Sequence, residues 1–547
     1  MIKPGREHEA GVTALVLGPM LRYVGPGCAT VWVETAAPCE VEVLDHRART
    51  FTVAGHHYAL VVVRGLPESG DTPYEVHLDG ERVWPDPADG WPESRIRTRA
   101  ATDAVRLAFG SCRVAGPLDD ESSGVDALHA LAEQMRFARP HTWPDELLLV
   151  GDQVYADENI SPETRAFIES RRDTSVGAGH EVADVEEYTH LYRESWSVPP
   201  VRWLLSTVPS AMVFDDHDVR DDWNTSAAWR QQMQATDWWQ GRIEAGLMTY
   251  WLYQHLGNLS PEDLAGNELY AALQAHDGDG EELLRDFARA ADAESDGGGP
   301  TRWSYRRDLG TSRLLVLDSR CGRVLNPERR EMFDEPEWAW FTDNLEGDYD
   351  HLLLATSLPY LLPPGVHHLE AFDEALAGGV WGERMAGLGE KLRQGADLEH
   401  WAAFGTSFAC MTGALADVGS RPNAPATVTF LSGDVHFAYL AEAWFTARPE
   451  VRTRVYQAVC SPLRNPLPKA VSVGQRFASS RVAGRIGRGL ARATRVAPPE
   501  LTWRITGGPA FGNEVAVLEL DGRSALLHVE KAVEGPALKH SFAKVLA

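Results

Sequence analysis

Six short, mainly apolar runs in this sequence each end in a small group of polar residues, and this repeated pattern constrains the fold more than any other feature. Such runs are typical of strands that are buried on both faces in a layered α/β fold. Ligands bind such sheets beyond the carboxyl ends of their strands. The runs and the residues that follow them are VRLAF-GSCR (105–113), ELLLV-GDQVY (146–155), AMVF-DDHD (211–218), RLLVL-DSR (313–320), HLLLA-TSLP (351–359) and TVTFL-SGDVH (427–436).

Two regions of the chain differ in their sequence pattern. Residues 1–103 alternate or run β-branched between Gly, Pro and Asp, which predicts an N-terminal all-β sandwich domain. Over residues 104–547 strands alternate with long helical segments, which predicts a large α/β (α+β) domain that carries the function. Within it we expect a helix-rich insertion at about 223–300, ending in an acidic surface segment, and a basic segment at about 464–495.

Composition argues against several classes of protein. The formal net charge of −27 does not suit general nucleic-acid binding, which needs a basic surface. The six cysteines lack paired metal-binding spacing, so we expect mostly free thiols of a reducing compartment. We see no transmembrane segment, no signal peptide and no twin-arginine pair. These observations predict a soluble, cytoplasmic protein.

Each strand end has an ordinary structural interpretation when it is considered alone. Cys112 is compatible with a small buried hydrophobic residue. Residues 215–218 are compatible with a helix N-terminus, and residues 432–436 with a turn. Arg320 is compatible with an ion pair to Asp318. Together, however, these ends supply a thiol, carboxylates, a phenol and imidazoles, which form a set of metal ligands.

The stretch around Asp152 suggests two neighbouring cations. A pair of cations needs a bridging group, and the two carboxylate oxygens of Asp152 make it the candidate. Tyr155 suggests a strongly Lewis-acidic partner such as Fe³⁺, because a free phenol ionises only near pH ~10. Cys112 would bind the same cation as a thiolate. The glycines before Asp152 and Asp434 would let the backbone approach closely.

The motifs resemble the alkaline phosphatase D (PhoD-like) metallophosphatases of the calcineurin-like phosphoesterase superfamily. The Asp-x-x-Tyr pair is also similar to that of purple acid phosphatases, in which the tyrosine binds ferric iron. The resemblance implies a metallophosphoesterase-type β-sheet sandwich flanked by helices and preceded by an all-β domain. It rests on Gly151-Asp152-x-x-Tyr155, Asp215-Asp216-His217-Asp218, Ser432-Gly433-Asp434-Val435-His436, FGSC at 109–112 and LDSR at 317–320.

The resemblance implies a site for two metal ions. In it, Asp152 bridges the metals, and Tyr155 and Cys112 lie on the iron side. The superfamily's Asp-x-His motif is absent, so oxygen surrounds the second metal. The expected cofactors are Fe³⁺ and a second divalent cation, with Ca²⁺ preferred over Mn²⁺ or Mg²⁺. The implied metal ligands are Cys112, Asp152, Tyr155, Asp216, Asp434 and His436.

The function that the resemblance implies is a metal-dependent phosphoric ester hydrolase, acting as a phosphomonoesterase, a phosphodiesterase or both. Metal-bound hydroxide would attack the phosphorus atom. We expect two catalytic side chains: His217 as proton donor to the leaving alcohol, and Arg320 as a clamp on two phosphate oxygens. An ion pair with Asp318 is the alternative for Arg320. The partner would be a small-molecule or lipid-linked phosphate ester.

Two other functions stay open from the sequence. One is a hydrolase that uses Cys112 as nucleophile with His217 or His436 as base, which leaves the aspartates and the tyrosine of the strand ends unexplained. The other is a catalytically silent binding protein of the same fold. Such proteins usually lose a ligand position, and none is visibly lost here.

The basic segment stands apart from the acidic remainder of the chain. Residues 464–495 hold eight basic residues and no acidic one, and their spacing predicts an amphipathic helix. Three roles are open: a surface helix that pairs with the acidic body, a peripheral contact with an anionic surface through residues 481–495, or a mobile lid weakened by its glycines. The residues concerned are Arg481, Arg485, Arg488, Arg492 and Arg495 on one face and Val482, Ile486 and Leu490 on an adjacent face.

Overall fold

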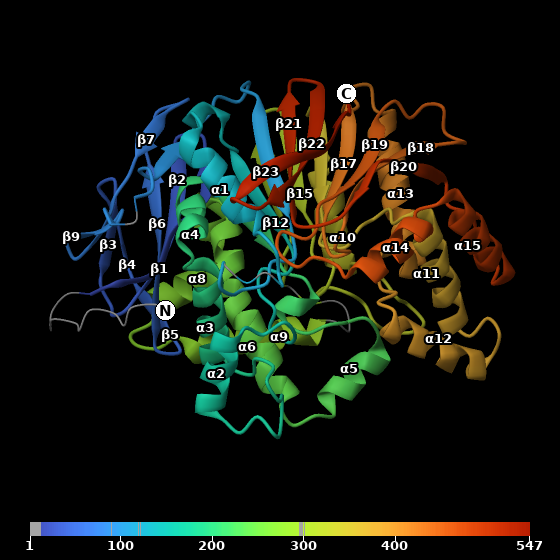
Figure 1. Ribbon diagram of the computed structural model, residues 1–547, viewed down its shortest axis with the longest axis horizontal. Coiled ribbons are helices and arrows are strands. Elements are labelled where there is room, and N and C mark those ends of the chain that lie inside the picture. Colours follow the sequence, from blue (N-terminus) through green and yellow to red (C-terminus); the bar gives the residue numbers. More distant parts are fainter. Residues whose placement is uncertain (1–12, 89, 119, 121, 295–298, 300) are drawn as a thin grey trace.

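The computed structural model describes residues 13–88, 90–118, 120, 122–294, 299 and 301–547. The expectation that the chain carries no signal peptide concerns residues 1–12 above all, and these lie outside the described residues. Figure 1 shows strands of the N-terminal region on one side of a larger body of sheets and helices. The predicted fold class, α/β with an all-β N-terminal region, is confirmed.

The N-terminal region consists mainly of short antiparallel strands in two facing sheets, in the orders β1-β2-β6-β5 and β4-β3-β8-β9, and β7 pairs with β10 in a separate two-stranded sheet. Side chains alternate between faces of a strand, so Val31 and its partner Val61 both point into the core between the sheets. The strands are β1 (Leu15–Gly25), β2 (Cys28–Thr35), β3 (Glu40–Val43), β4 (His46–Arg49), β5 (Phe51–Val53), β6 (His56–Arg64), β7 (Asp71–Pro73), β8 (Val76–Leu78), β9 (Glu81–Trp84) and β10 (Arg95–Arg97).

Two larger sheets form the centre of the molecule (Figure 1). Sheet I has the order β13 (Ser210–Val213), β12 (Glu146–Val150), β11 (Val105–Gly110), β21 (Glu514–Asp521), β22 (Ser524–Val533) and β23 (Ala537–Val545). Sheet II has the order β14 (Tyr305–Leu309), β15 (Ser312–Val316), β16 (His351–Ala355), β17 (Thr427–Ser432), β19 (Arg454–Val459), β18 (Ala438–Phe445) and β20 (Leu501–Ala510).

All the apolar runs singled out in the sequence are strands of these two sheets. β11, β12 and β13 are parallel neighbours in sheet I. β15, β16 and β17 are parallel neighbours in sheet II. The polar residues that follow the runs therefore leave each sheet at its carboxyl edge, as the sequence pattern predicted.

Burial on both faces explains why the runs are continuously apolar. In β12, Leu148 and Val150 belong to the core between the two sheets, whereas Leu147 and Leu149 pack under the helices that cover sheet I. In β16, Leu353 lies in the core between the sheets and Leu352 under the helices of sheet II. Every residue of β12 and β16 is buried, so a polar side chain in these strands needs a partner within the protein.

Helices cover the outer face of each sheet. None of the helices within the described ranges is long and apolar enough to cross a membrane. The helices are α1 (Ala127–Phe137), α2 (Pro162–Arg171), α3 (Val185–Trp196), α4 (Pro199–Thr207), α5 (Ala227–Gln234), α6 (Trp239–Thr249), α7 (Pro261–Gly266), α8 (Glu268–Ala275), α9 (Glu281–Ala293), α10 (Glu335–Asn344), α11 (Pro364–Ala377), α12 (Glu383–Gly395), α13 (Gly405–Ser420), α14 (Lys469–Ala478) and α15 (Arg481–Ala493).

The helix-rich insertion is more closely packed than the sequence suggested. Helix α9 buries Leu284, Ala288 and Ala291 in the largest hydrophobic core. Ahead of it, the Asp279 carboxylate accepts hydrogen bonds from backbone N–H groups of the N-terminal region, at 2.8 Å from Ala54 and 2.7 Å from Gly55. Helix α9 is therefore an amphipathic surface helix, and its apolar face packs against the body of the protein.

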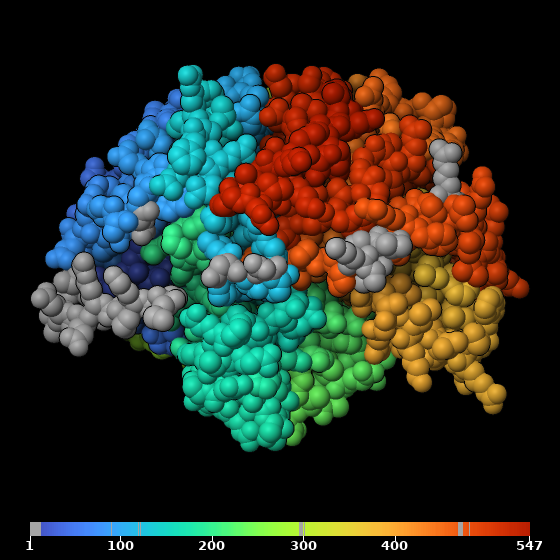
Figure 2. All heavy atoms as spheres, viewed as in Figure 1, coloured from blue at the N-terminus to red at the C-terminus, as the bar shows by residue number. Residues whose placement is uncertain are grey.

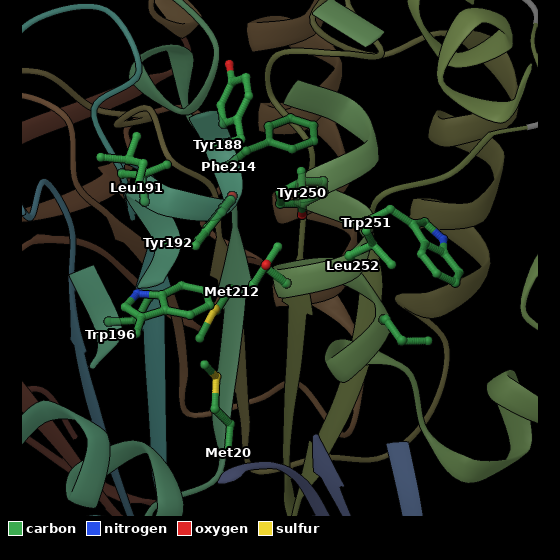
Figure 3. Packing of buried hydrophobic residues seen from close by; sticks show 14 of the residues in the cluster. Met20, Tyr188, Leu191, Tyr192, Trp196, Met212, Phe214, Tyr250, Trp251 and Leu252 are labelled. Carbon is green, nitrogen blue, oxygen red and sulfur yellow. The ribbon is translucent and has the colours of Figure 1, made fainter. Parts of the chain in front are cut away.

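One fully buried arginine joins the N-terminal region to the rest of the molecule. Arg22 of β1 donates hydrogen bonds to the backbone oxygens of Ser210 at 3.1 Å, Tyr253 at 2.6 Å and Gln254 at 2.7 Å. Figure 3 shows the apolar packing at this junction, where Met20 of β1 lies beside Met212 of β13. Burial and the nearby Arg307 lower the pKa of Arg22 to about 9.

We predict that replacing Arg22 with leucine destabilises the protein by about 3 kcal/mol or more, because buried backbone oxygens lose a charged donor and gain no substitute. Chemical denaturation monitored by circular dichroism measures the free energy of unfolding. Replacement of the exposed Arg47 with leucine is the matched control and should change that free energy by less than about 0.5 kcal/mol. Equal stability of the two variants would contradict the proposed junction.

Candidate metal centre

Hydrogen bonds to backbone N–H groups draw together the ends of three neighbouring strands of sheet I. The buried Asp218 carboxylate accepts from the N–H of Asp152 at 3.0 Å and from the N–H of Asp215 at 2.9 Å, which links the ends of β12 and β13. Between the ends of β11 and β12, the N–H of Cys112 donates to the backbone oxygen of Gly151 at 3.2 Å. Asp218 thus acts as a structural support of the site.

Two glycines allow this close approach. A Cβ atom on Gly151 would lie 2.7 Å from the Cβ of Asp215, and Gly151 also has a φ of +104°. A Cβ atom on Gly433 would lie 2.0 Å from the Oγ of Ser111. These contacts are too short for any side chain, so the expectation that both glycines serve backbone approach is confirmed.

Four of the predicted ligand residues have left-handed backbone conformations, which non-glycine residues rarely adopt. The φ values are 57° for Cys112, 51° for Asp152, 66° for Asp434 and 56° for His436. Each such conformation costs on the order of 1–3 kcal/mol and persists only where the surrounding structure enforces it. These backbone conformations direct the four side chains toward the same region beyond the carboxyl edges of the sheets.

The first group of side chains combines sulfur, oxygen and nitrogen donors. Ligand atoms of Cys112, Asp152 and His436 lie within 4.8 Å of one another. The Tyr155 hydroxyl lies 3.4 Å from Asp152 Oδ2 and 3.4 Å from His436 Nε2. The Cys112 thiol lies 3.3 Å from the same oxygen of Asp152. This geometry brings together Tyr155 and Cys112, which the resemblance placed on the iron side, with the expected bridging group Asp152 and the expected ligand His436.

Burial favours the neutral forms of these groups. It raises the pKa of the Cys112 thiol to about 12, with a further contribution from Asp434. Burial and the neighbouring Cys112 raise the pKa of Tyr155 and of Asp152 well above their usual ranges. Burial and the nearby His217 lower the pKa of His436 to about 4, so its imidazole is neutral and has a free electron pair. A cation reverses this preference for the thiol and the phenol, because it stabilises their anions.

The second group consists of carboxylates around a buried guanidinium. Oxygens of Asp215, Asp216 and Asp434 lie within 4.8 Å of one another. Arg320 is fully buried beside them: its Nε contacts Asp215, its Nη2 lies 3.2 Å from Asp216 Oδ1 and its Nη1 contacts Glu399. Among the side chains that the structure describes, Asp152 Oδ1 and Asp215 Oδ2 are buried without a hydrogen-bond partner. Such orphaned carboxylate oxygens fit a bound cation.

The surroundings of Arg320 differ from both interpretations drawn from the sequence. Asp318 does not pair with the guanidinium; its carboxylate accepts from the backbone N–H groups of Arg320 at 2.8 Å and Gly322 at 2.9 Å. The guanidinium itself lies behind the carboxylates, and Arg320 is not among the residues that line the cavity. The ion pair expected as the alternative exists, but with Asp215, Asp216 and Glu399.

His217 faces the cavity with one ring nitrogen already engaged. Its Nδ1 lies 3.0 Å from Asp157 Oδ1, and its ring stacks on Tyr155 with centroids 4.5 Å apart. Burial opposes the charged form, but the Asp157 and Asp216 carboxylates raise the pKa of His217 well above its usual range. The protonated imidazole therefore presents Nε2–H to the cavity.

A third histidine at the site, His400, was not predicted from the sequence. His400 Nδ1 lies 2.8 Å from Glu370 Oε1, and its Nε2 lies 2.8 Å from Asp434 Oδ2. Burial alone would raise the pKa of Asp434. The hydrogen bond and the charge of His400 outweigh it and help to lower that pKa to about 2. His400 and Glu399 lie in an irregular segment with no strand pattern, so nothing local in the sequence marks them. Asp157 closes the stretch GDQVYAD and was within reach of the strand-end argument.

The two groups of side chains open into one acidic cavity of about 370 Å³. Carboxylates dominate its lining, and an anion could not enter it without cations to offset that charge. The titratable side chains that line it are Asp152, Glu158, Asp216, His217, Asp221, Glu370, Asp397, Glu399, His400, Asp434 and His436.

Comparisons with known proteins agree with the motifs. Residues 123–277 match a family model described as PhoD-like phosphatase, and residues 12–96 match a domain of unknown function, DUF7800. The first match includes Asp152, Tyr155, Asp216 and His217, and it ends before the C-terminal motifs. No curated protein matched the sequence.

Two solved structures resemble the fold. A structure of PhoD is 12% identical with a TM-score of 0.61, and the match covers 99% of this chain and 91% of that one. A structure of the purple acid phosphatase PPD1 from yellow lupin (Lupinus luteus) seeds is 11% identical with a TM-score of 0.48, and the match covers 96% and 73% of the two chains. The resemblance to PhoD-like phosphatases that the motifs predicted is therefore confirmed, by the family model over residues 123–277 and, for the fold, by the structure of PhoD.

Proposed function

We propose that this protein is a metal-dependent phosphoric ester hydrolase that acts on phosphate monoesters, phosphate diesters or both. The observation that carries the proposal is the position of Asp152. One of its carboxylate oxygens faces Cys112 and Tyr155, and the other is buried without a partner. The carboxylate lies within 4.8 Å of ligand atoms of Cys112 and His436 on one side, and of Asp216 and His217 on the other. A carboxylate in that position suits a pair of cations better than it suits a folded protein without metal.

The donor set supports two different cations. Cys112, Tyr155 and His436 would hold Fe³⁺, since a thiolate and a phenolate require a strong Lewis acid. The oxygens of Asp216 and Asp434 would hold Ca²⁺, or alternatively Mn²⁺ or Mg²⁺. When bound, such cations stabilise the negative charge of a phosphoryl group and lower the pKa of an attacking water molecule.

The chain's own side chains would supply proton transfer and positioning. His217 donates the proton of Nε2 to the leaving alcohol oxygen, and Asp157 keeps the opposite nitrogen in place and the ring charged. Arg320 is a positioning residue rather than a clamp on phosphate, because its guanidinium already forms ion pairs with Asp215, Asp216 and Glu399. His400 holds Asp434 in the same way from the other side.

The alternative of a thiol hydrolase has less support. The Cys112 thiol is fully buried, and burial raises its pKa to about 12. A nucleophilic cysteine needs the opposite environment, electropositive and partly exposed. The alternative of a silent binding protein is decided by turnover.

The first test is replacement of Asp152 with asparagine. Hydrolysis of a generic aryl phosphate should fall by more than about 10²-fold, because even residues that only support metal ligands often contribute 10–100-fold. Circular dichroism should show an intact fold. The exposed Asp286→Asn variant is the matched control and should retain full turnover. Near-full activity of Asp152→Asn would remove the bridging role, and an inactive parent protein would favour the silent binding protein.

The second test concerns proton donation by His217. In His217→Ala, esters with poor leaving groups should slow by about 10²- to 10⁴-fold, whereas esters of weakly basic alcohols should slow much less because they need no proton. Asp157→Asn should give the same trend with smaller losses. Rates measured over a leaving-group series separate the models, since equal losses across the series would leave His217 with positioning alone.

A further inference from the structure

Helix α15 packs tightly along one face, which explains two of its three glycines; a Cβ atom on the third, Gly489, would meet open space. A Cβ atom on Gly484 would lie 3.1 Å from Pro364, and one on Gly487 would lie 2.9 Å from the Cβ of His368, both on helix α11. Ala483 and Ala491 are buried on the same face. Gly484 and Gly487 thus allow close contact between α11 and α15, so these two glycines have a packing role and are not by themselves a sign of a mobile lid.

The remaining circumference of α15 is open to solvent and divides into two stripes. Val482 is 55% exposed, Ile486 56% and Leu490 37%. Steps of four residues advance by about 40° around a helix, so these three side chains form one continuous apolar stripe. Arg485, Arg488 and Arg492 follow it on the adjacent side of the helix. Figure 2 shows the segment at the outer edge of the molecule.

The arginine stripe borders a cavity of about 760 Å³ with no acidic residue in its lining, as far as the described side chains go. Arg485, Arg488 and Arg492 share it with Arg504 and His368. Burial, Arg488 and Arg492 lower the pKa of His368 to about 4, which reflects the local positive potential. Apolar side chains complete the wall, namely Trp444, Trp503, Pro498, Pro499, Leu501 and Ile505.

The other roles considered for this segment do not match its position. Among the described side chains, no carboxylate forms an ion pair with Arg485, Arg488 or Arg492, so the helix does not pair with the acidic body. The cavity of the metal centre is lined by Gln475 of α14 and, within the described part of the chain, by no residue of α15.

We propose that α15 is a docking surface for an anionic lipid bilayer. We define the α15 surface as the apolar stripe Val482, Ile486 and Leu490 together with the arginine stripe Arg485, Arg488 and Arg492. The apolar stripe would enter the boundary between headgroups and acyl chains, and the arginines and the cavity beside them would take the headgroup phosphates. This inference does not depend on the proposed hydrolysis.

Charge and exposure favour a bilayer over other occupants. A second copy of the chain would bring its own arginine stripe, and like charges at close range repel. A bilayer satisfies both stripes at once, which a purely charged or purely apolar partner cannot do. Because the protein as a whole has a net charge of −27, anionic lipid would attract this surface and repel the others, which orients the molecule.

Sedimentation with vesicles tests the proposal. The full chain should bind phosphatidylcholine vesicles that contain phosphatidylglycerol and bind pure phosphatidylcholine vesicles much more weakly. The triple variant Arg485→Gln, Arg488→Gln, Arg492→Gln should lose about 10²-fold in partition coefficient, at roughly 5-fold per arginine. The triple variant Val482→Ser, Ile486→Ser, Leu490→Ser should lose roughly 10-fold or more. Both variants should hydrolyse a soluble aryl phosphate as the parent does.

A matched control uses arginines elsewhere on the surface. Arg47, Arg64 and Arg82 of the N-terminal region, replaced together by Gln, should leave vesicle binding unchanged. The proposal is overturned if the parent protein does not bind anionic vesicles or if both α15 variants bind them as the parent does. It is also overturned if the arginine control loses as much affinity as the α15 variants. Sedimentation velocity adds one further outcome: a dimer that the Val482, Ile486, Leu490 variant abolishes would make the stripe a contact between copies instead.

Discussion

The buried guanidinium of Arg320 stabilises the group of carboxylates at the site through ion pairs. Its single positive charge does not balance all of them. It contacts Asp215, Asp216 and Glu399 and lies 3.8 Å from Asp434. Even so, burial and the Asp216 charge outweigh Arg320 and raise the pKa of Asp215 to about 8. Without metal, the folded chain must therefore keep some of these carboxyl groups protonated, because its own cations only partly offset their charge. That deficit is the physical reason why the site should take up metal ions.

The scaffold has to hold this arrangement against its own strain. Cys112, Asp152, Asp434 and His436 all adopt left-handed backbone conformations, at a cost on the order of 1–3 kcal/mol each. Two sheets buried on both faces supply the rigid edge from which these residues project. Such a loss of folding free energy to backbone strain is characteristic of functional sites, because a relaxed backbone would point the side chains elsewhere.

Local patterns predicted the strands and their polar ends, because continuous apolar runs and terminal glycines carry that information in a few adjacent residues. The partners of Arg320 could not be predicted, since β13 and the segment around Glu399 meet β15 only in the folded chain. His400 was missed for the same reason. The packing role of Gly484 and Gly487 could not be predicted either, because helix α11, which they contact, becomes their neighbour only in the folded chain.

The central claim is that the converging strand ends hold two metal ions, one of them ferric. Elemental analysis combined with the visible spectrum of the purified protein tests it most directly. The account predicts about two bound ions per chain, one of them iron, and a visible charge-transfer band that changes in Tyr155→Phe. A protein that binds no metal would contradict the metal centre. A metal-loaded protein that is colourless and free of iron would contradict the assignment of Cys112 and Tyr155 to a ferric site.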